Sequence, residues 1–272
     1  MDVNKLKEVY KQKGAVILRD FLSEEWIQRG INGVEQVFAN PSKYAQTFPY
    51  VYGEGHYFRD YGNWKDNVDI RDLIFKSPIV KAIADIVDSR SVTLYHDQTI
   101  VKDPRNMLLV GFQQRMSNYP FAGSQGCTAY VTLDRVPLET ALKVVIGSHL
   151  WGKTFYPDGF NPQCVSEEAK SDQYETVPNI FAMHDLGIME WSLNPGDVIL
   201  YDMRCVVSTN GNATEHLQRA LGLHFFGEDA KFVERPWPIN PPFTGNLKMG
   251  DHPSKDPSMF PIVYPDSSRE SA

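Results

Sequence analysis

Histidine, cysteine and carboxylate side chains are the groups in this chain that could bind a metal ion or carry protons. The cysteines Cys127, Cys164 and Cys205 are far apart and form no Cys-x-x-Cys pair. None of the histidines begins a His-x-Asp or His-x-Glu motif, which would set two metal ligands on one side of a strand. They are His56, His96, His149, His184, His216, His224 and His252. No short motif therefore predicts a metal site.

Several of these residues could instead be catalytic without a metal. Cys205 would need a nearby histidine or carboxylate to act as a nucleophile, and none can be argued from the sequence, so we predict a packed thiol. His149 and His224 are interpreted as hydrogen-bonded structural residues. His96-Asp97 suggests acid–base catalysis by its composition, but a structural role is favoured there as well.

The elements that would position a site change type near residue 91. Before it, apolar spacing and capping residues predict helices over 4–13, between Ser23 and Asn40, and after Ser77-Pro78, with a strand over 15–18. After it, short apolar runs separated by turn residues predict about seven strands. The runs are SVTLYHD, MLLVGFQQ, CTAYVTLD, ALKVVIG, IMEWSL, DVILYDM and ALGLHFF. This order predicts a mainly β fold with flanking helices (α+β), a double-sheet jelly roll.

We expect one domain over residues 1–272. Residues 1–90 would form a helical support, residues 91–228 the jelly-roll core, and residues 229–272 a Pro-rich arm that wraps its own domain or a neighbour. The aromatic stretch 44–68 is predicted to be a loop at a pocket rim. The polar stretch 151–186 is predicted to be a lid or rim loop.

Composition excludes some classes of partner. The net charge is −7, the pI is near 5.5 and no basic run occurs, which argues against binding to nucleic acid. No apolar run approaches the roughly 18 residues of a membrane span. The charged N-terminus is unlike a secretory signal, and an odd number of scattered cysteines indicates a reducing compartment. We expect a cytoplasmic protein that makes no membrane contact.

Several separated motifs between about residues 90 and 226 resemble the phytanoyl-CoA dioxygenase family of non-haem iron, 2-oxoglutarate-dependent oxygenases. They are Tyr95-His96-Asp97-Gln98, Val101-Lys102-Asp103-Pro104, Leu133-Asp134, Ile146-Gly147-Ser148-His149, the stretch from Pro195 to Asp202, and the stretch from Asn212 to Arg219-Ala220. The resemblance implies a double-stranded β-helix, a cupin-like jelly roll, with its pocket at one mouth of the roll.

That family holds iron with a His-x-Asp motif and a distal histidine. Counted from the shared motifs, these ligands fall on Phe112, Gln114 and Val207, and the arginine that binds 2-oxoglutarate falls on Gln218. Phenyl and isopropyl groups offer no lone pair, and a neutral amide is a poor substitute for a carboxylate. The resemblance therefore implies a degenerate member that lacks the metal triad and binds neither iron nor 2-oxoglutarate.

The same comparison gives expectations for the old pocket. Phe112 and Val207 are expected to plug it with apolar side chains. Lys102, Tyr95 and Arg219 are possible pocket residues, although Arg219 follows Gln218 on a strand and should point to the opposite face.

The first functional hypothesis is an auxiliary or regulatory subunit. It would dimerise with an iron-competent homologue in natural-product (terpenoid-type) biosynthesis, similar to the inactive partner of heterodimeric fungal dioxygenases. Fe(II), 2-oxoglutarate and a hydrophobic substrate would be bound in the partner, and residues 236–265 or 151–186 would make the contact.

Three alternatives stay open. One is a metal-independent isomerase or cyclase acting on a hydrophobic natural product, with a pocket rimmed by Tyr50, Tyr52, Tyr57, Phe58, Tyr61 and Trp64. Another is a ligand-sensing protein without catalysis. The third is a 2-oxoglutarate dioxygenase with unorthodox iron ligands.

Overall fold

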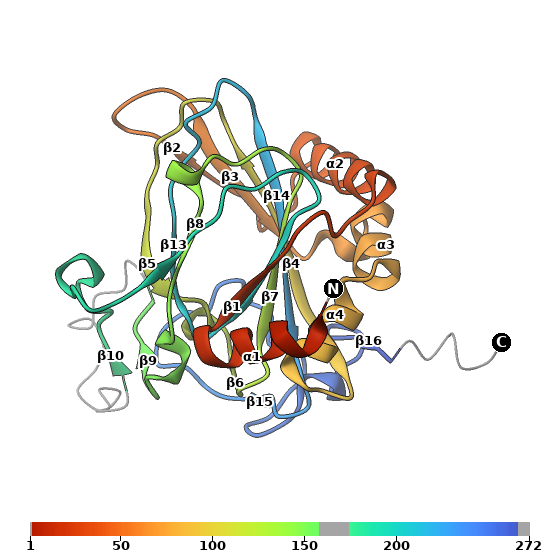
Figure 1. Cartoon of the computed structure of the whole chain (residues 1–272). Helices are drawn as coiled ribbons and strands as arrows, with labels where there is room; N and C mark the ends of the chain where they lie inside the picture. The colour runs from red at the N-terminus through yellow and green to blue at the C-terminus, as the bar shows by residue number, and fades with distance from the viewer. Residues whose placement is uncertain (1, 158–173, 266–272) are drawn as a thin grey trace.

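Two β-sheets form the centre of the molecule, and the computed structural model describes residues 2–157 and 174–265 (Figure 1). The large sheet contains β1 (Ala15–Leu18), β2 (Gln46–Pro49), β3 (His56–Tyr61), β4 (Val92–Lys102), β7 (Cys127–Thr132), β12 (Val198–Asp202), β14 (Gln218–Phe226) and β16 (Ile262–Tyr264). The small sheet contains β5 (Val110–Gln114), β8 (Leu142–Val145), β11 (Ile188–Met189) and β13 (Val206–Thr209). Two short pairs complete the strands: β6 (Phe121–Ala122) with β15 (Lys231–Phe232), and β9 (Thr154–Phe155) with β10 (Tyr174–Glu175).

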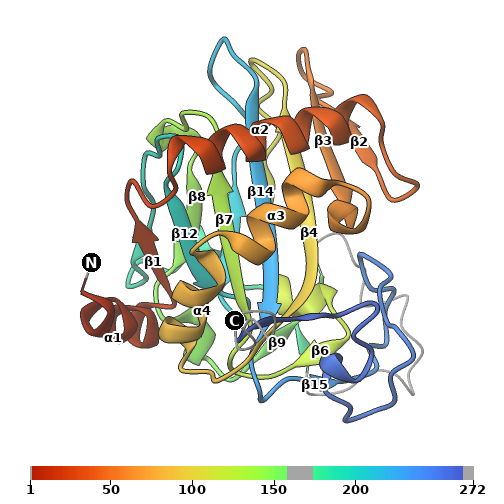
Figure 2. The same cartoon turned by 90° about the vertical axis from the view of Figure 1, so that its right-hand side faces the viewer.

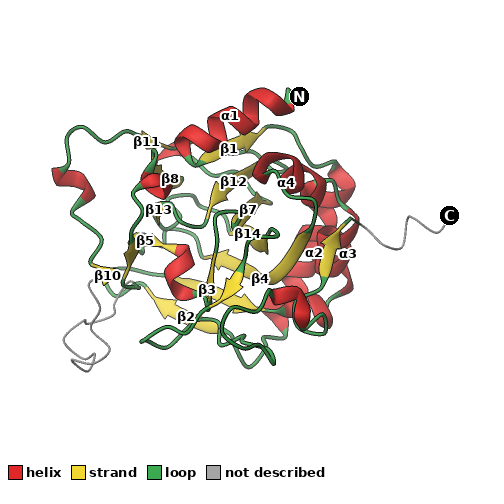
Figure 3. Ribbon diagram, turned by 90° about the horizontal axis from the view of Figure 1, so that it is seen from below, coloured by secondary structure: helices red, strands yellow, loops and turns green. Residues whose placement is uncertain are grey.

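Strand order shows the jelly roll. The large sheet runs β1-β12-β7-β14-β4-β3-β2, with β16 also paired to β4, and the small sheet runs β11-β8-β13-β5. Along the chain, β4, β7, β12 and β14 enter the large sheet, and β5, β8 and β13 enter the small sheet between them. The two sheets face each other across a common interior (Figures 1 and 3). The predicted mainly β jelly roll with flanking helices is confirmed.

The α-helices of the described residues lie on the outside of the large sheet. They are α1 (Val3–Lys13), α2 (Glu24–Ala39), α3 (Val68–Lys76) and α4 (Ile79–Val87), of which α2, α3 and α4 lie across the strands (Figure 2). Leu221 and Leu223 of β14 pack in the core under these helices, whereas Gly222 and His224 face the barrel interior. No helix in the described ranges is long and apolar enough to cross a lipid bilayer.

The first 90 residues are not only a helical support. β1 pairs with β12, and β3 pairs with β4, so both strands extend the large sheet. The stretch 44–68, predicted as a loop, contains the hairpin β2–β3, and α3 was not predicted. Side chains alternate between the two faces of β3, and Tyr57 and Tyr61 face the interior. Phe58 on the opposite face is also aromatic, so the sequence shows no alternation of apolar and polar residues that would predict a strand.

The Pro-rich C-terminal segment packs on its own domain. Phe232, Trp237, Phe243, Phe260 and Val263 are buried in it. β16 also pairs with β4, so residues 229–265 close the lower end of the barrel rather than project as a free arm. Much of the predicted 151–186 loop, residues 158–173, lies outside the described residues.

Gly14 joins α1 to β1 and needs to be glycine. It ends the helix at φ 88°, and its carbonyl accepts a hydrogen bond from the Asp202 backbone N–H at 2.9 Å. A Cβ at this position would collide with Cys205 Sγ and His149 Nδ1. Both the left-handed backbone and the close packing therefore exclude a side chain.

Substitution of Gly14 by alanine tests this packing argument through the stability of the protein. Gly14→Ala should lower the free energy of unfolding by about 2–4 kcal/mol, because a left-handed non-glycine residue and overpacking both cost energy. Gly152→Ala is the matched control: φ is 67°, and nothing lies within 4 Å of the added Cβ. It should cost about 1 kcal/mol, from the backbone alone. Chemical denaturation measures both, and equal losses would contradict the packing argument.

Candidate functional site

Strand pairing decides which residues of β5 face the barrel interior. Val207 of β13 lies directly opposite Gln113, and Val206 lies opposite Gln114. Val207 packs with Leu142, Val144 and Tyr201 between the two sheets. Directly paired residues share a face of the sheet, so Gln113 also faces inward, while Phe112 and Gln114 face outward.

The predicted positions Phe112 and Gln114 are therefore outside the old pocket. Phe112 packs against the outer cluster of Val145, Phe155, Ile180 and Val206. The Gln114 amide donates to the backbone oxygens of Lys153 and Arg204 at 3.0 and 2.8 Å. It also accepts from Ser117 Oγ and from the backbone N–H of Phe155. Both side chains stabilise the scaffold, and the expectation that Phe112 plugs the barrel is wrong.

A cavity occupies the interior that was expected to be plugged. Its main part has a volume of about 440 Å³. It is lined by Phe48, Tyr57, Arg59, Tyr61, Gln98, Leu108, Leu109, Val110, Gln113, Arg115, Asn118, Tyr119, Pro157, Pro238 and Asn240. A deeper part of about 20 Å³ shares Tyr57, Gln98 and Arg115 with it. The deeper part is also lined by Ile100, Lys102, Thr128, Tyr130, Leu142, Tyr201, Thr209, Gly222 and His224.

The charged groups of this cavity are all basic among the described residues. Arg59 and Arg115 line the main part, and Lys102 and Arg115 line the deeper part. Lys102 Nζ donates to the carbonyl oxygens of Asn210 at 2.7 Å and Gly211 at 3.4 Å. Burial lowers the pKa of Lys102 to about 8, which still leaves it mostly protonated at neutral pH.

Two stacked histidines lie at the base of the cavity. The rings of His96 and His224 are 4.3 Å apart, and only His224 lines the deeper part. His96 Nδ1 lies 3.0 Å from the Asp97 carbonyl oxygen, so it carries the proton. Burial lowers the pKa of His96 to about 3, and burial, then His96 and Arg115, lower that of His224. Both rings stay neutral, which favours hydrogen bonding over general-base catalysis.

The other predicted site residues are dispersed. Gln218 faces inward at the start of β14, but its amide donates to the Arg135 carbonyl oxygen at 3.4 Å and it lines neither part of the cavity. Arg219 faces outward and pairs with Asp134 and with Glu35 of α2, so it is not a pocket residue. Tyr95 is not one either, because it packs within an aromatic cluster behind His96. Lys102 does line the cavity.

The predicted aromatic rim is also divided. Tyr57 and Tyr61 line the cavity, whereas Phe58 and Trp64 pack under the helices, and Tyr52 lies 88% exposed beyond β2.

Cys205 is a buried free thiol that donates to the Gly14 carbonyl oxygen at 3.5 Å. Burial raises its pKa, which fits the predicted packing role.

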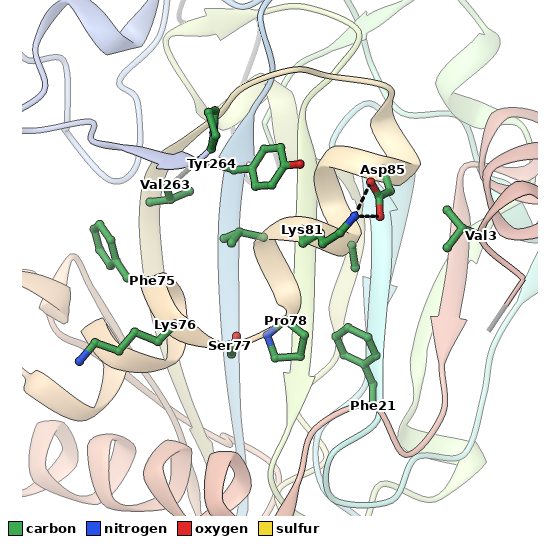
Figure 4. Close-up of a pocket in the computed structure, with 13 residues that line it drawn as sticks. Val3, Phe21, Phe75, Lys76, Ser77, Pro78, Lys81, Asp85, Val263 and Tyr264 are labelled. Carbon is green, nitrogen blue, oxygen red and sulfur yellow. Dashed lines mark hydrogen bonds and ion pairs between the residues drawn. The ribbon is translucent and has the colours of Figure 1, made fainter. Parts of the chain in front are cut away.

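A larger cavity, of about 780 Å³, lies on the far side of the large sheet between α4 and β16 (Figure 4). Its lining is mostly apolar, including Phe21, Phe75 and Val263. Its charged side chains are Lys76 and the Lys81–Asp85 ion pair, which spans 2.7 Å on α4. These groups do not form a catalytic set, so the barrel cavity is the candidate site.

The model of the phytanoyl-CoA dioxygenase (PhyH) family matches residues 10–220. The chain belongs to this family. No curated protein matches the sequence. Among solved structures, the epimerase SnoN, crystallised with Fe³⁺, α-ketoglutarate and nogalamycin RO, is 16% identical over 96% of this chain and 98% of its own, with a TM-score of 0.75.

Two further PhyH-like folds are similar. The α-ketoglutarate-dependent carbocyclase SnoK is 18% identical over 95% of each chain, with a TM-score of 0.70. EctD from S. alaskensis, solved with 2-oxoglutarate and 5-hydroxyectoine, is 14% identical over 91% of this chain and 84% of its own, with a TM-score of 0.67. SnoN and SnoK come from nogalamycin biosynthesis. At these identities the similarity shows the dioxygenase-like jelly roll and nothing finer.

The inward residues of this chain do not fit the iron centre of the PhyH family. Gln113 faces inward opposite Val207, and Arg115 also lines the cavity, so a His-x-Asp pair that faces inward from this strand would fall on Gln113-Gln114-Arg115. Val207 offers no ligand atom, and a guanidinium cannot lose its proton to coordinate a cation. In residues 2–157 and 174–265, no group of three His, Cys, Asp or Glu side chains could hold a metal ion.

The one-residue difference in register can be tested by restoring the ligands. Gln113→His/Arg115→Asp/Val207→His should bind about one equivalent of Co(II), because two imidazoles and a carboxylate then converge from neighbouring strands. The matched control Phe112→His/Gln114→Asp/Val207→His should bind none, since two of its ligands face outward. Anaerobic titration followed by visible spectroscopy measures uptake. Equal uptake by the two variants would refute the register.

Proposed function

We propose that this chain is a catalytically incomplete, dioxygenase-like PhyH protein that binds a small molecule without iron. We further propose that it acts as an auxiliary or regulatory subunit of an iron-competent PhyH homologue in natural-product biosynthesis. The observation that carries the proposal is that Arg115 lines the barrel cavity, at the position where we infer that the family has its iron-binding carboxylate. Fe(II) and 2-oxoglutarate would be bound by the partner.

Charge and space support the first part of the proposal. The Arg115 guanidinium is permanently positive and would repel a divalent cation at the centre of the barrel. The main cavity of about 440 Å³ lies within the usual range for small-molecule sites. A protein retained only for its scaffold would gain stability from filling this space with apolar side chains. The open cavity therefore favours a bound ligand.

Exposed apolar side chains near the cavity support the second part. Leu109 lines the cavity and is 58% exposed, and Met107 beside it is 43% exposed. The turn between β2 and β3 carries the exposed side chains of Val51 and Tyr52. Gly55 of this turn lies against Asp103 and Pro104, so the turn is close to the loop that carries Met107 and Leu109. Such a cluster is typical of a protein–protein contact. We define Val51, Tyr52, Met107 and Leu109 as the apolar rim.

The similarity to SnoN and SnoK, which come from nogalamycin biosynthesis, supports the biosynthetic setting of the proposal, and the partner's substrate would be a hydrophobic natural product. We expect the pair in the cytoplasm, because Cys127 and Cys205 are buried free thiols. A net charge of −7 argues against nucleic acid as a partner.

A second candidate is a metal-independent isomerase or cyclase. The open cavity with a neutral His224 beside Arg115 favours it, because a cation can stabilise an enolate while an imidazole moves a proton. The lowered pKa of His224 makes it a weak base, however. Product formed by the purified chain in the presence of EDTA would establish this candidate over the auxiliary subunit.

If this chain does not bind iron, its thermal stability should not respond to Fe(II) or to a chelator. Fe(II) with 2-oxoglutarate, and separately EDTA, should leave the melting temperature of the chain unchanged, and no 2-oxoglutarate should be consumed. SnoN serves as the positive control. Stabilisation by Fe(II) at one equivalent, reversed by EDTA, would contradict the proposal and revive an unorthodox dioxygenase.

The partner contact predicts a difference between two surface variants. Val51→Glu/Met107→Glu should weaken co-purification with an iron-competent PhyH homologue from the same source about tenfold, because charges replace apolar contacts. Met249→Glu, at a residue that is 60% exposed in the C-terminal segment, is the control and should have no effect. If the homologue never co-purifies with the wild-type chain, the auxiliary role is wrong.

A further inference from the structure

The lining of the cavity is positively charged in a protein that is acidic overall. Its described lining contains Arg59, Lys102 and Arg115 and neither aspartate nor glutamate, although the whole chain has a net charge of −7. Buried cations are normally paired, because an unpaired charge loses its solvation on burial. The described residues thus leave the positive charge of this cavity without a counter-charge.

Arg115 is the least satisfied of these cations. It follows β5 at the start of the 3₁₀ turn Arg115–Asn118, and its Nε is buried without a hydrogen-bond partner in the described part of the chain. Its side-chain partner is Tyr201, with which it shares a hydrogen bond, and Tyr61 and Tyr119 lie in its electrostatic surroundings; burial raises the pKa of these three phenols, so none of them supplies a counter-charge. By contrast, Arg59 Nε donates to Gln46 Oε1 at 2.7 Å.

Arg235 shows what a purely structural arginine is like in this fold. Its guanidinium donates to the carbonyl oxygens of Tyr119 at 3.0 Å, Phe121 at 2.8 Å and Met116 at 3.4 Å. It therefore ties the C-terminal segment to the turn after β5. Among the hydrogen bonds of the described residues, Arg115 has no such set of backbone acceptors. Its side chain lines both the main part and the deeper part of the cavity.

We infer that the cavity binds an organic carboxylate with an apolar body, and that Arg115 pairs with the carboxylate. This inference rests on the proposed iron-free ligand binding and names the class of ligand. A guanidinium and a carboxylate match in shape and can form two parallel hydrogen bonds. The bound anion supplies the counter-charge that the described residues do not.

The two parts of the cavity set the orientation of the ligand. Tyr57, Gln98 and Arg115 line both parts, so they form the passage between them. The deeper part of about 20 Å³ has room for about one water molecule and cannot hold the ligand body. The body therefore lies in the main part, against Phe48, Leu108 and Tyr119, with the carboxylate at the passage. Lys102 adds positive charge behind it.

Stability without ligand distinguishes a binding arginine from a structural one. Arg115→Met should leave the melting temperature of the ligand-free chain unchanged or raise it, because an unpaired buried charge is replaced by an apolar group. Arg235→Met should lower it by several degrees, because it leaves backbone acceptors unpaired. Thermal unfolding of the two variants at equal concentration measures the difference. A loss at Arg115→Met as large as that at Arg235→Met would mean that Arg115 is structural and would overturn the inference.

Ligand binding provides the direct test. Isothermal titration should show that cinnamate and related aryl carboxylates bind the wild-type chain, and that the matched carboxamides bind at least about tenfold more weakly. Arg115→Met should weaken carboxylate binding by about 10- to 100-fold and leave carboxamide binding unchanged. Arg115→Lys should recover only part of the affinity, since an ammonium lacks the planar fork. 2-Oxoglutarate, which lacks an apolar body, should bind weakly or not at all.

The outcomes separate the two proposals. Equal binding of acids and amides, abolished by the cavity-filling variant Gln113→Trp, would overturn the anion inference and keep the iron-free binding site. If 2-oxoglutarate binds and the aryl carboxylates do not, the inference that the ligand has an apolar body is wrong. If neither acids nor amides bind the wild-type chain, the proposed ligand-binding function fails, and the inference with it.

Discussion

The pairing of Val207 with Gln113 across the small sheet determines what the centre of this protein can bind. Side chains alternate between the two faces of a strand, so this one pairing sends Gln113 inward and Phe112 and Gln114 outward. The chain then turns at Arg115, whose side chain enters the cavity. A shift of one residue would instead turn the Phe112 ring and the Gln114 amide toward the interior. The chemistry of the site thus follows from hydrogen-bond register more than from composition.

A positive interior of this kind needs support from the rest of the fold. The helices on the outer face of the large sheet and the C-terminal segment at its lower end bury most of the apolar surface, which offsets the cost of polar groups inside the barrel. Burial lowers the pKa of both His96 and His224, and the positive charge of Arg115 lowers it further, so the pair stays neutral and adds no charge to the interior.

Much of the fold could be predicted, but the site could not. The capping residues and apolar spacing of 4–13 and 24–39 match α1 and α2, and the strand runs after residue 91 match the jelly roll. The hairpin β2–β3 was missed because both faces of β3 carry aromatic side chains. The outward direction of Phe112 and Gln114 could not be predicted, because residues 103–109 are an irregular connection with no period to keep the register. Gln113-Gln114-Arg115 has the spacing of His-x-Asp, and pairing with Val207 was the information that the sequence lacked.

The interior of this barrel is not an ordinary protein core. When a catalytic site loses its function and only the scaffold is retained, the stable outcome is apolar packing, since cavities and unpaired charges both reduce the free energy of unfolding. Here the opposite combination is present: a cavity of about 440 Å³ remains beside a guanidinium whose Nε has no partner in the described chain. In the proposed assignment, a guanidinium stands where the family has a metal-binding carboxylate, which would change the preference of the site from a metal cation to an organic anion. The proposed ligand-binding function accounts for both the open space and the sign of its charge.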